Sequence, residues 1–247
     1  MNHYTIVMVG YNSAPWIQKS VESALSQEHP SFDVIAIDAD TDDGTYDILK
    51  KYEGVDNFTL VRNDIRKYQI ENIATGVQLS KPNSIVCTLD FDDWLSSPYV
   101  LSHLDTLYKN DDVWMTYGSY IDAFDDIVTS HRIKDRYDDD VVTTNSFRTA
   151  EWQASHLRTF RRELFLKINQ EDFIDKDTGN MYTMAGDLSF MLPMLEMAGE
   201  RFEVSPTPLY IYNRQNPLSE DKVCLSDQER QANQIRNRTK YQRLDVL

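Results

Sequence analysis

The sequence of 247 residues is 41% apolar and 11% aromatic, which is enough to bury the core of one large α/β domain, or of a domain with a small lobe, and excludes a disordered chain. Its 40 acidic and 25 basic residues give a formal net charge of -15 at pH 7, so its overall field disfavours a general attraction to nucleic acid or anionic membranes. The two cysteines, Cys87 and Cys224, are too few for a disulfide framework and favour a reducing compartment. Residues 1–10 lack the features of a signal peptide and no apolar run is long enough to span a bilayer, so we expect a cytoplasmic protein with no transmembrane segment.

The first half of the sequence alternates between strand and helix patterns. Apolar, β-branched runs predict strands at 5–10, 32–38, 58–61 and 85–89. Helical patterns lie between them, from an N-cap at Ser13 toward Gln27, through 46–49 and over 70–80. Single helices between strands predict βαβ units and a parallel sheet, in which ligands bind at the carboxyl ends of the strands.

The second half is less regular. A helix is predicted from Ser97 and Pro98 to Tyr108, followed by a strand at 113–117 and an acidic surface excursion over 122–140 with a strand near 127–133. The main cationic cluster lies in 151–167. The remaining elements are a helix over 187–198, short strands at 202–204 and 208–212, and a helical tail from Ser226 with a thin apolar face.

Three carboxylates follow one buried strand directly. Asp90, Asp92 and Asp93 come immediately after 85–89, and carboxylates beside a buried strand are costly unless a cation neutralises them. Oxygen ligands suit Mg²⁺ or Mn²⁺, which keep waters and accept phosphate oxygens. The pattern therefore predicts a metal site for a phosphorylated ligand; the simpler interpretation is a polar loop in which Asp92 caps the next helix.

Five segments in order, at 5–27, 32–45, 84–95, 185–199 and 208–214, resemble the inverting glycosyltransferases of family 2, and the similarity spans about residues 4–215. An acidic triplet alone is common on surfaces, whereas the ordered set is specific. The resemblance implies an α/β fold of the Rossmann-like GT-A type, with a mostly parallel central sheet flanked by helices and a C-terminal extension on the acceptor side. It divides the chain into a nucleotide-sugar-binding half (1–118), an acceptor-binding and catalytic-base half (119–215), and a C-terminal loop and helical tail (216–247).

The resemblance also implies the site residues. Asp92 would be the main metal ligand for Mn²⁺ or Mg²⁺, with Asp90 and Asp93 beside it, and Asp187 would be the catalytic base. The expected donor-binding residues are Tyr11, Asn12, Asp38, Asp40, Arg66, Asp90 and Arg214. The segment with the cationic cluster, rather than the resemblance, gives the expected acceptor or diphosphate contacts, Trp152, His156 and Arg158. The simpler interpretation of His156 and Arg158 is a solvated face or salt bridges to the acidic excursion.

Two positions depart from the family pattern. The usual Glu-Asp pair is Gly186-Asp187, which leaves the catalytic position occupied. Ala39 stands where the family usually has the Asp that contacts the uracil ring. Either Asp38 or Asp40 takes over its role, or the donor base is not uracil. A UDP-sugar remains the first choice of donor.

In the implied reaction an acceptor hydroxyl attacks the anomeric carbon from the face opposite the nucleoside diphosphate. A hydroxyl is a poor nucleophile, so Asp187 would take its proton, and the metal would stabilise the leaving diphosphate. The alternatives are a nucleotidyltransferase-like enzyme and a non-catalytic nucleotide- or glycan-binding module. The residue types leave open whether the acceptor is a glycan, a lipid-linked sugar, a protein or a modified nucleic-acid base, and they leave the oligomeric state open.

Overall fold

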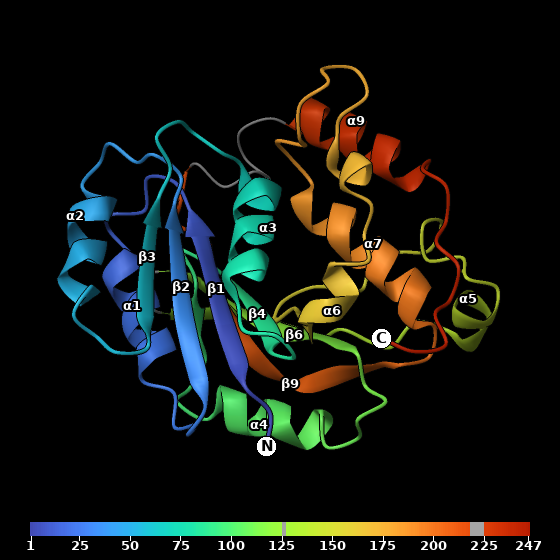
Figure 1. Ribbon diagram of the computed structural model, residues 1–247, viewed down its shortest axis with the longest axis horizontal. Coiled ribbons are helices and arrows are strands. Elements are labelled where there is room, and N and C mark those ends of the chain that lie inside the picture. The colour runs from blue at the N-terminus through green and yellow to red at the C-terminus, as the bar shows by residue number, and fades with distance from the viewer. Residues whose placement is uncertain (125–126, 218–224) are drawn as a thin grey trace.

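The computed structural model describes residues 1–124, 127–217 and 225–247. Within these residues the molecule is built on one nine-stranded sheet with the order β3-β2-β1-β4-β8-β6-β9-β5, and β7 pairs with β6 outside this path (Figure 1). The helices cover both faces of this sheet, which confirms the predicted α/β class.

The first half of the sheet is parallel, as predicted. It consists of β1 (Tyr4–Gly10), β2 (Phe32–Asp38), β3 (Phe58–Arg62) and β4 (Ile85–Asp90), and β1 pairs with both β2 and β4. The connecting helices are α1 (Ile17–Leu25), α2 (Thr45–Leu49) with the 3-10 turn Lys50–Tyr52, and α3 (Gln69–Leu79). The central strands β1 and β4 are almost entirely buried because helices lie on both of their faces, whereas β3, at the edge of the sheet, is mostly accessible.

The second half of the sheet mixes directions. It contains β5 (Trp94–Leu95), β6 (Met115–Phe124), β7 (Ile127–Arg132), β8 (Thr159–Arg161) and β9 (Phe202–Asn213). Only β6 and β9 pair in parallel among these, whereas β8 is antiparallel to β4 and β6. The helices are α4 (Val100–Leu107), α5 (Asp139–Thr143), α6 (Arg162–Phe165), the 3-10 turn Gln170–Phe173, α7 (Gly186–Ala198) and α9 (Leu225–Arg236).

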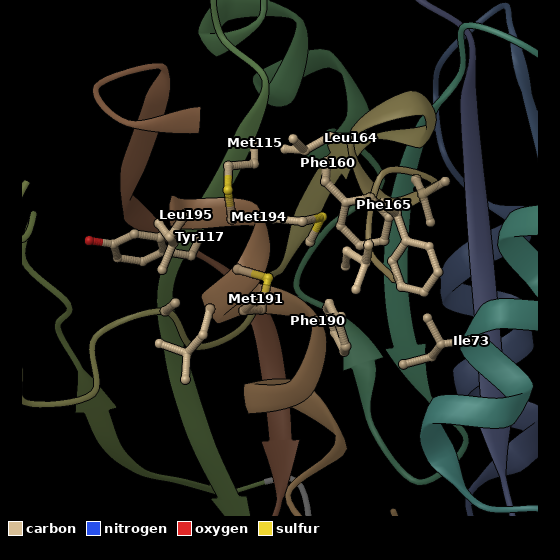
Figure 2. Close-up of a cluster of buried hydrophobic side chains, with 14 of the residues drawn as sticks. Ile73, Met115, Tyr117, Phe160, Leu164, Phe165, Phe190, Met191, Met194 and Leu195 are labelled. Carbon is tan, nitrogen blue, oxygen red and sulfur yellow. The ribbon is translucent and has the colours of Figure 1, made fainter. Parts of the chain in front are cut away.

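Two hydrophobic cores lie on opposite faces of the sheet. One core contains residues of α1, α2 and α4, and the other contains residues of α3, α6 and α7. Figure 2 shows Met191 and Met194 of α7 among the side chains of Met115, Phe160 and Phe165. Almost every residue of α7 is buried, so this helix packs into the core on nearly all of its sides.

Several predicted boundaries are wrong for identifiable reasons. Ser13 does not cap α1: its carbonyl accepts the N–H groups of Trp16 and Ile17 in a separate turn, and α1 begins one turn later. The Ser97 hydroxyl accepts the N–H of Tyr99, so α4 likewise begins later, at Val100. The two short strands predicted at 202–204 and 208–212 are one strand, β9, because both parts pair with β6 across a register shift.

Two further expectations concern chemistry rather than boundaries. Cys87 is buried and free, while Cys224 lies outside the described residues. In the described ranges we find no helix that is both long and apolar enough to cross a membrane.

Candidate active site

A cavity of about 390 Å³ lies at the carboxyl ends of β1 and β4, between α3 and the start of α7. This is the edge of the sheet where ligands of parallel α/β proteins bind, and the volume suits a small ligand. Its wall combines residues from five distant segments: Tyr11, Arg66 and Gln69, Asp90 to Asp93, His156 and Arg158, and Asp187. In Figure 1, α3 separates β1 from α7.

Three carboxylates at the end of β4 line this cavity: Asp90, Asp92 and Asp93. We call residues 90–93 the acidic turn. Asp90 accepts hydrogen bonds from Gln69 Nε2 at 3.2 Å and from the Tyr210 hydroxyl at 3.3 Å. Burial raises the pKa of Asp90. Asp92 accepts a hydrogen bond from Asn216 Nδ2 at 2.7 Å. The turn packs closely against β1 because Gly10 has no side chain: a Cβ there would lie 2.4 Å from the Phe91 Cβ.

Asp93 is the most enclosed of the three carboxylates. It is 2% exposed, and its oxygens accept the Tyr210 hydroxyl at 2.6 Å and the Asn213 N–H at 2.7 Å. Burial, followed by the charges of Asp92 and Asp90, raises the pKa of Asp93 well above its usual value. Both oxygens of Asp93 thus fix the acidic turn to β9, and its predicted metal role stays a prediction.

The acidic turn fits part of a metal site. Over the described ranges, no three side chains of His, Cys, Asp or Glu converge as a complete metal-binding group. Asp90 and Asp92 nevertheless both line the cavity. Mg²⁺ is commonly bound by one or two carboxylates, with water and substrate phosphate completing the set. The pair therefore fits a site that a phosphorylated ligand completes.

The opposite wall is formed by Asp187, in the first turn of α7. Its Oδ2 accepts Arg158 NH2 at 2.8 Å, and its Oδ1 accepts the N–H of Leu188 at 2.9 Å. Arg158 is 5% exposed and also donates to the Ala154 carbonyl and to His156 Nδ1, at 3.2 Å in each case. Arg158 is therefore neither on a solvated face nor paired with the acidic excursion, but holds His156 and Asp187 in fixed positions.

This arrangement defines the hydrogen position on His156. A guanidinium can only donate, so His156 Nδ1 accepts and the imidazole hydrogen lies on Nε2. Burial, and then the positive charges of Arg158, Arg214 and Lys134, lower the pKa of His156 well below its usual value, so the ring is neutral. The ring stacks on Tyr210 at 4.4 Å. His156 therefore presents a neutral N–H donor at the cavity wall.

The far end of the cavity is aromatic and cationic. Tyr11 and Arg66 both line it, and the Arg66 guanidinium lies 3.8 Å above the Tyr11 ring. Tyr68 adds a second ring, 5.2 Å from the same guanidinium. Ala39 forms part of the wall where the family carries its base-reading carboxylate.

Four predicted donor residues do not line this cavity within the described part of the chain: Asn12, Asp38, Asp40 and Arg214. Asn12 is hydrogen-bonded to Asp42 at 2.8 Å, and Arg214 donates to Asp122 at 2.6 Å.

Asp38 and Asp40 both turn toward Arg62 instead, at 3.5 and 3.8 Å respectively. Asp38 is fully buried, and burial raises its pKa. Neither carboxylate is placed to replace the missing one at Ala39.

Trp152 also lies away from the cavity wall. Its side chain packs against the core on the α7 side, and its carbonyl accepts Lys134 Nζ at 3.4 Å. The predicted acceptor contacts are thus reduced to His156 and Arg158.

Sequence reasoning missed several residues of the cavity wall: Gln69, Asn72, Thr183, Met184 and Gln228. Gln69 has the clearest signal in retrospect, because Gly186 leaves room for it. A Cβ at Gly186 would lie 2.8 Å from Gln69 Oε1. The alternation of Tyr210 and Tyr212 in the strand pattern is typical of core packing; Tyr210 is fully buried, and its hydroxyl also binds the acidic turn.

Comparison with known proteins gives sequence relatives. A protein of Bacillus subtilis (strain 168), the glycosyltransferase TuaG, whose name places it in teichuronic acid biosynthesis, is 38% identical over 94 residues, which are 36% of this chain and 35% of TuaG. The Escherichia coli enzyme WfaP, named UDP-Glc:alpha-D-GlcNAc-diphosphoundecaprenol beta-1,3-glucosyltransferase, is 24% identical over 129 residues, 52% of this chain and 50% of that enzyme. The matches therefore span only about a third to a half of these relatives.

Solved structures give the fold. S. aureus TarS in complex with UDP superposes with a TM-score of 0.62 at 13% identity, over 85% of this chain and 60% of that chain. The mannosyltransferase PcManGT from Pyrobaculum calidifontis, in complex with GDP-Man and Mn²⁺, gives a TM-score of 0.57 at 17% identity, over 85% of this chain and 56% of that chain. The fold is therefore the GT-A fold of glycosyltransferases.

The family profile covers most of the chain. Residues 5–182 match the family described as Glycosyl transferase family 2. That range includes the acidic turn, His156 and Arg158, and it ends five residues before Asp187. On this match the chain belongs to glycosyl transferase family 2.

Proposed function

We propose that this chain is a metal-dependent, inverting glycosyltransferase that moves a sugar from a nucleoside diphosphate sugar to an acceptor hydroxyl. The observation that carries this proposal is the composition of one cavity, which is lined by Asp90 and Asp92, by Asp187 and Arg158, and by Tyr11 and Arg66. The cavity thus offers carboxylates for a cation, a proton acceptor, and an aromatic side chain for a planar base.

The donor would lie across the acidic turn. Tyr11 and Arg66 offer a ring and a guanidinium to a nucleobase, while Asp92, with Asp90, would hold Mn²⁺ or Mg²⁺ against the diphosphate. When bound, the cation would neutralise charge on the departing diphosphate. The complexes of TarS with UDP and of PcManGT with GDP-Man and Mn²⁺ support a nucleotide donor and a divalent metal.

UDP is our first choice of nucleotide. The names or complexes of two relatives contain uridine nucleotides, and one contains GDP-Man. Ala39 provides no side-chain hydrogen bond to the base, so base selection would depend on backbone groups and on Tyr11 and Arg66.

Asp187 would act as the base. As the acceptor oxygen forms its bond to the anomeric carbon, Asp187 takes the hydroxyl proton, and the electron pair of the broken carbon–oxygen bond leaves with the nucleoside diphosphate. Arg158 keeps the carboxylate oriented, and the Nε2–H of His156 donates to an acceptor oxygen. One displacement inverts the anomeric centre and needs no covalent intermediate.

The acceptor is proposed to be a carbohydrate hydroxyl. The names of both curated relatives refer to carbohydrate products or acceptors. A nucleotidyltransferase is disfavoured because no glycine-rich phosphate loop follows β1, where the sequence is Gly10-Tyr11-Asn12-Ser13.

The test combines binding and turnover. The chain is incubated with UDP-glucose, UDP-N-acetylglucosamine or GDP-mannose and a panel of mono- and oligosaccharide acceptors, with Mn²⁺ or with EDTA, and released nucleoside diphosphate is measured. We expect metal-dependent release from one donor, lost in Asp92→Asn together with UDP affinity. Asp187→Asn should retain UDP affinity but lower turnover at least about a hundredfold.

The matched control is Asp47→Asn, an exposed aspartate on α2 outside the cavity, which should behave as the unmodified chain. UDP binding without release from any donor would instead support a non-catalytic binding module.

A further inference from the structure

The C-terminal helix α9 lies against the segment that leads to the proposed base. Figure 1 shows α9 beside the chain that enters α7. Gln228, in the first half of α9, lines the same cavity as Asp187. The family match ends at residue 182, so neither α9 nor this entry segment belongs to the matched range.

One side chain of α9 binds the entry segment through three hydrogen bonds. Gln231 is 3% exposed. Its Oε1 accepts the backbone N–H groups of Thr183 at 3.0 Å and Met184 at 2.9 Å, and its Nε2 donates to Thr183 Oγ1 at 3.0 Å. Thr183 and Met184 themselves line the cavity, so Gln231 supports the cavity wall from behind.

The entry segment needs this support. Ala185, which precedes α7, has a φ of 53°, in the left-handed region that non-glycine residues rarely adopt. Such a conformation persists where neighbouring contacts hold it. Asp187 follows two residues later, so the direction in which its carboxylate enters the cavity depends on the backbone at 183–185.

A second set of contacts fixes α9 itself. Arg230 binds Asp175 through NH2 at 2.8 Å and Asp177 through NH1 at 2.7 Å. Gln234 accepts the Tyr182 hydroxyl at 2.8 Å. Because residues 230, 231 and 234 fall on one helix face, the helix is held on the loop over several points and Gln231 cannot easily turn away.

We infer that Gln231 is a positioning residue for the reaction, and that α9 completes the active site by holding the Thr183–Met184 backbone so that Asp187 faces the acceptor. This inference rests on the proposed function, because it assigns Gln231 a role through Asp187 as base. Gln231 touches no reacting atom; it acts through the backbone it binds.

The test compares two substitutions at one site. Gln231→Leu keeps the size of the side chain but removes the acceptor of two partly buried N–H groups. Gln231→Glu keeps the acceptor for both N–H groups, and the Thr183 hydroxyl can turn to donate to it. The matched control is Gln242→Leu, the same amide-to-apolar change at an exposed position of the tail.

Three quantities are measured for each variant: amide hydrogen exchange of a peptide containing residues 183–184, the affinity for UDP with Mn²⁺, and the turnover of the donor that the unmodified chain uses. We expect Gln231→Leu to exchange at least tenfold faster there and to lose about tenfold or more in turnover, with UDP affinity within twofold. Gln231→Glu should recover turnover to within threefold, and Gln242→Leu should match the unmodified chain. Thr183→Val, a milder lesion of the same contact, should lower turnover two- to fivefold if Gln231→Leu does not fold.

The outcomes are distinguishable. If the unmodified chain releases nucleoside diphosphate and Gln231→Leu is equally active, the inference is wrong while the proposed function stands. Equal losses of UDP affinity and turnover would mean a general structural role and would also overturn it. No release by the unmodified chain from any donor would overturn the proposed function itself.

Discussion

Gly186 controls the position of a side chain that binds the acidic turn. A Cβ at this position would lie 2.8 Å from Gln69 Oε1, which is too close for the present arrangement. The other end of the same amide, Gln69 Nε2, donates to Asp90 Oδ1 at 3.2 Å. We therefore expect Gly186→Ala to displace the Gln69 side chain and break its bond to Asp90, without a large change in α7, because a flexible side chain moves more easily than backbone.

The size of the effect follows from that one hydrogen bond. A hydrogen bond between an amide and a carboxylate contributes about 1 to 2 kcal/mol. If the donor binds only when Gln69 holds Asp90 in its present position, losing this bond makes that arrangement less populated by the same free energy. Since 1.4 kcal/mol corresponds to a factor of ten, the affinity for UDP with Mn²⁺ should then fall by roughly 5- to 30-fold at most. Gln69→Ala removes the same bond directly and should cost a similar amount.

A double-mutant cycle isolates the link. Gly186→Ala and Gln69→Ala act on one contact, so the double variant should lose little more affinity than either single variant, and the coupling free energy should be as large as one single effect, at most about 1 to 2 kcal/mol. Isothermal titration with UDP and Mn²⁺ gives the four affinities. Gly54→Ala is the matched control, because a Cβ there meets nothing within 4 Å. Fully additive losses, or an effect of Gly186→Ala below twofold, would refute the link through Gln69.

The sequence predicted the parts of this fold that depend on local pattern. The apolar run before Asp90 is β4, and β1 and β2 lie within one residue of their predicted ranges. The carboxyl ends of parallel strands share one edge of the sheet, so the sequence pattern alone predicts that Tyr11 and the acidic turn lie close together. Asp187 also lines this cavity. It was predicted there from the resemblance to the family, not from its local sequence pattern.

The prediction of two short strands in place of β9 failed because β9 depends on contacts between distant residues. Pro206 and Pro208 interrupt the strand pattern, yet β9 continues because the interruption falls at its register shift against β6. The predicted starts of α1 and α4 were wrong for a local reason: the Ser13 carbonyl and the Ser97 hydroxyl form separate turns before each helix begins.

The cationic cluster shows the same limit. Composition identified Arg158 as a candidate ligand contact, but not that its guanidinium would bind both His156 and Asp187. Gln69 and Gln231 carry no charge, follow no motif and act across about 120 and 50 residues of sequence respectively; only the folded chain shows their roles.

Three further predictions concern stability and proton chemistry. Glu196→Leu should lower the free energy of unfolding in urea by about 3 to 5 kcal/mol, because it leaves buried Arg148 without its bidentate partner at 2.7 and 2.8 Å. Combining Glu196→Leu with Arg148→Met should recover most of that loss. Equal losses in the single and the double variant would count against an uncompensated buried charge as the cause. His156→Phe keeps the stacked ring but removes the N–H donor, so turnover should fall about tenfold with UDP affinity unchanged; because the pKa of His156 lies well below its usual value, the pH–rate profile of the unmodified chain should show no ionisation of this imidazole between about pH 6 and 8. Finally, the hydrogen bond from Arg230 lowers the pKa of Asp175 to about 2, below its value in the unfolded chain, so the unfolded state binds more protons over the interval between the two values. The ion pair should therefore contribute its full stability above about pH 4 and lose it as the pH falls toward 2; since solvent screens Arg230, we expect this contribution to be small. Urea unfolding at pH 6 and pH 3 measures this difference, and an equal loss of stability in the unmodified chain and in Asp175→Asn would show that the pair does not hold α9 in place.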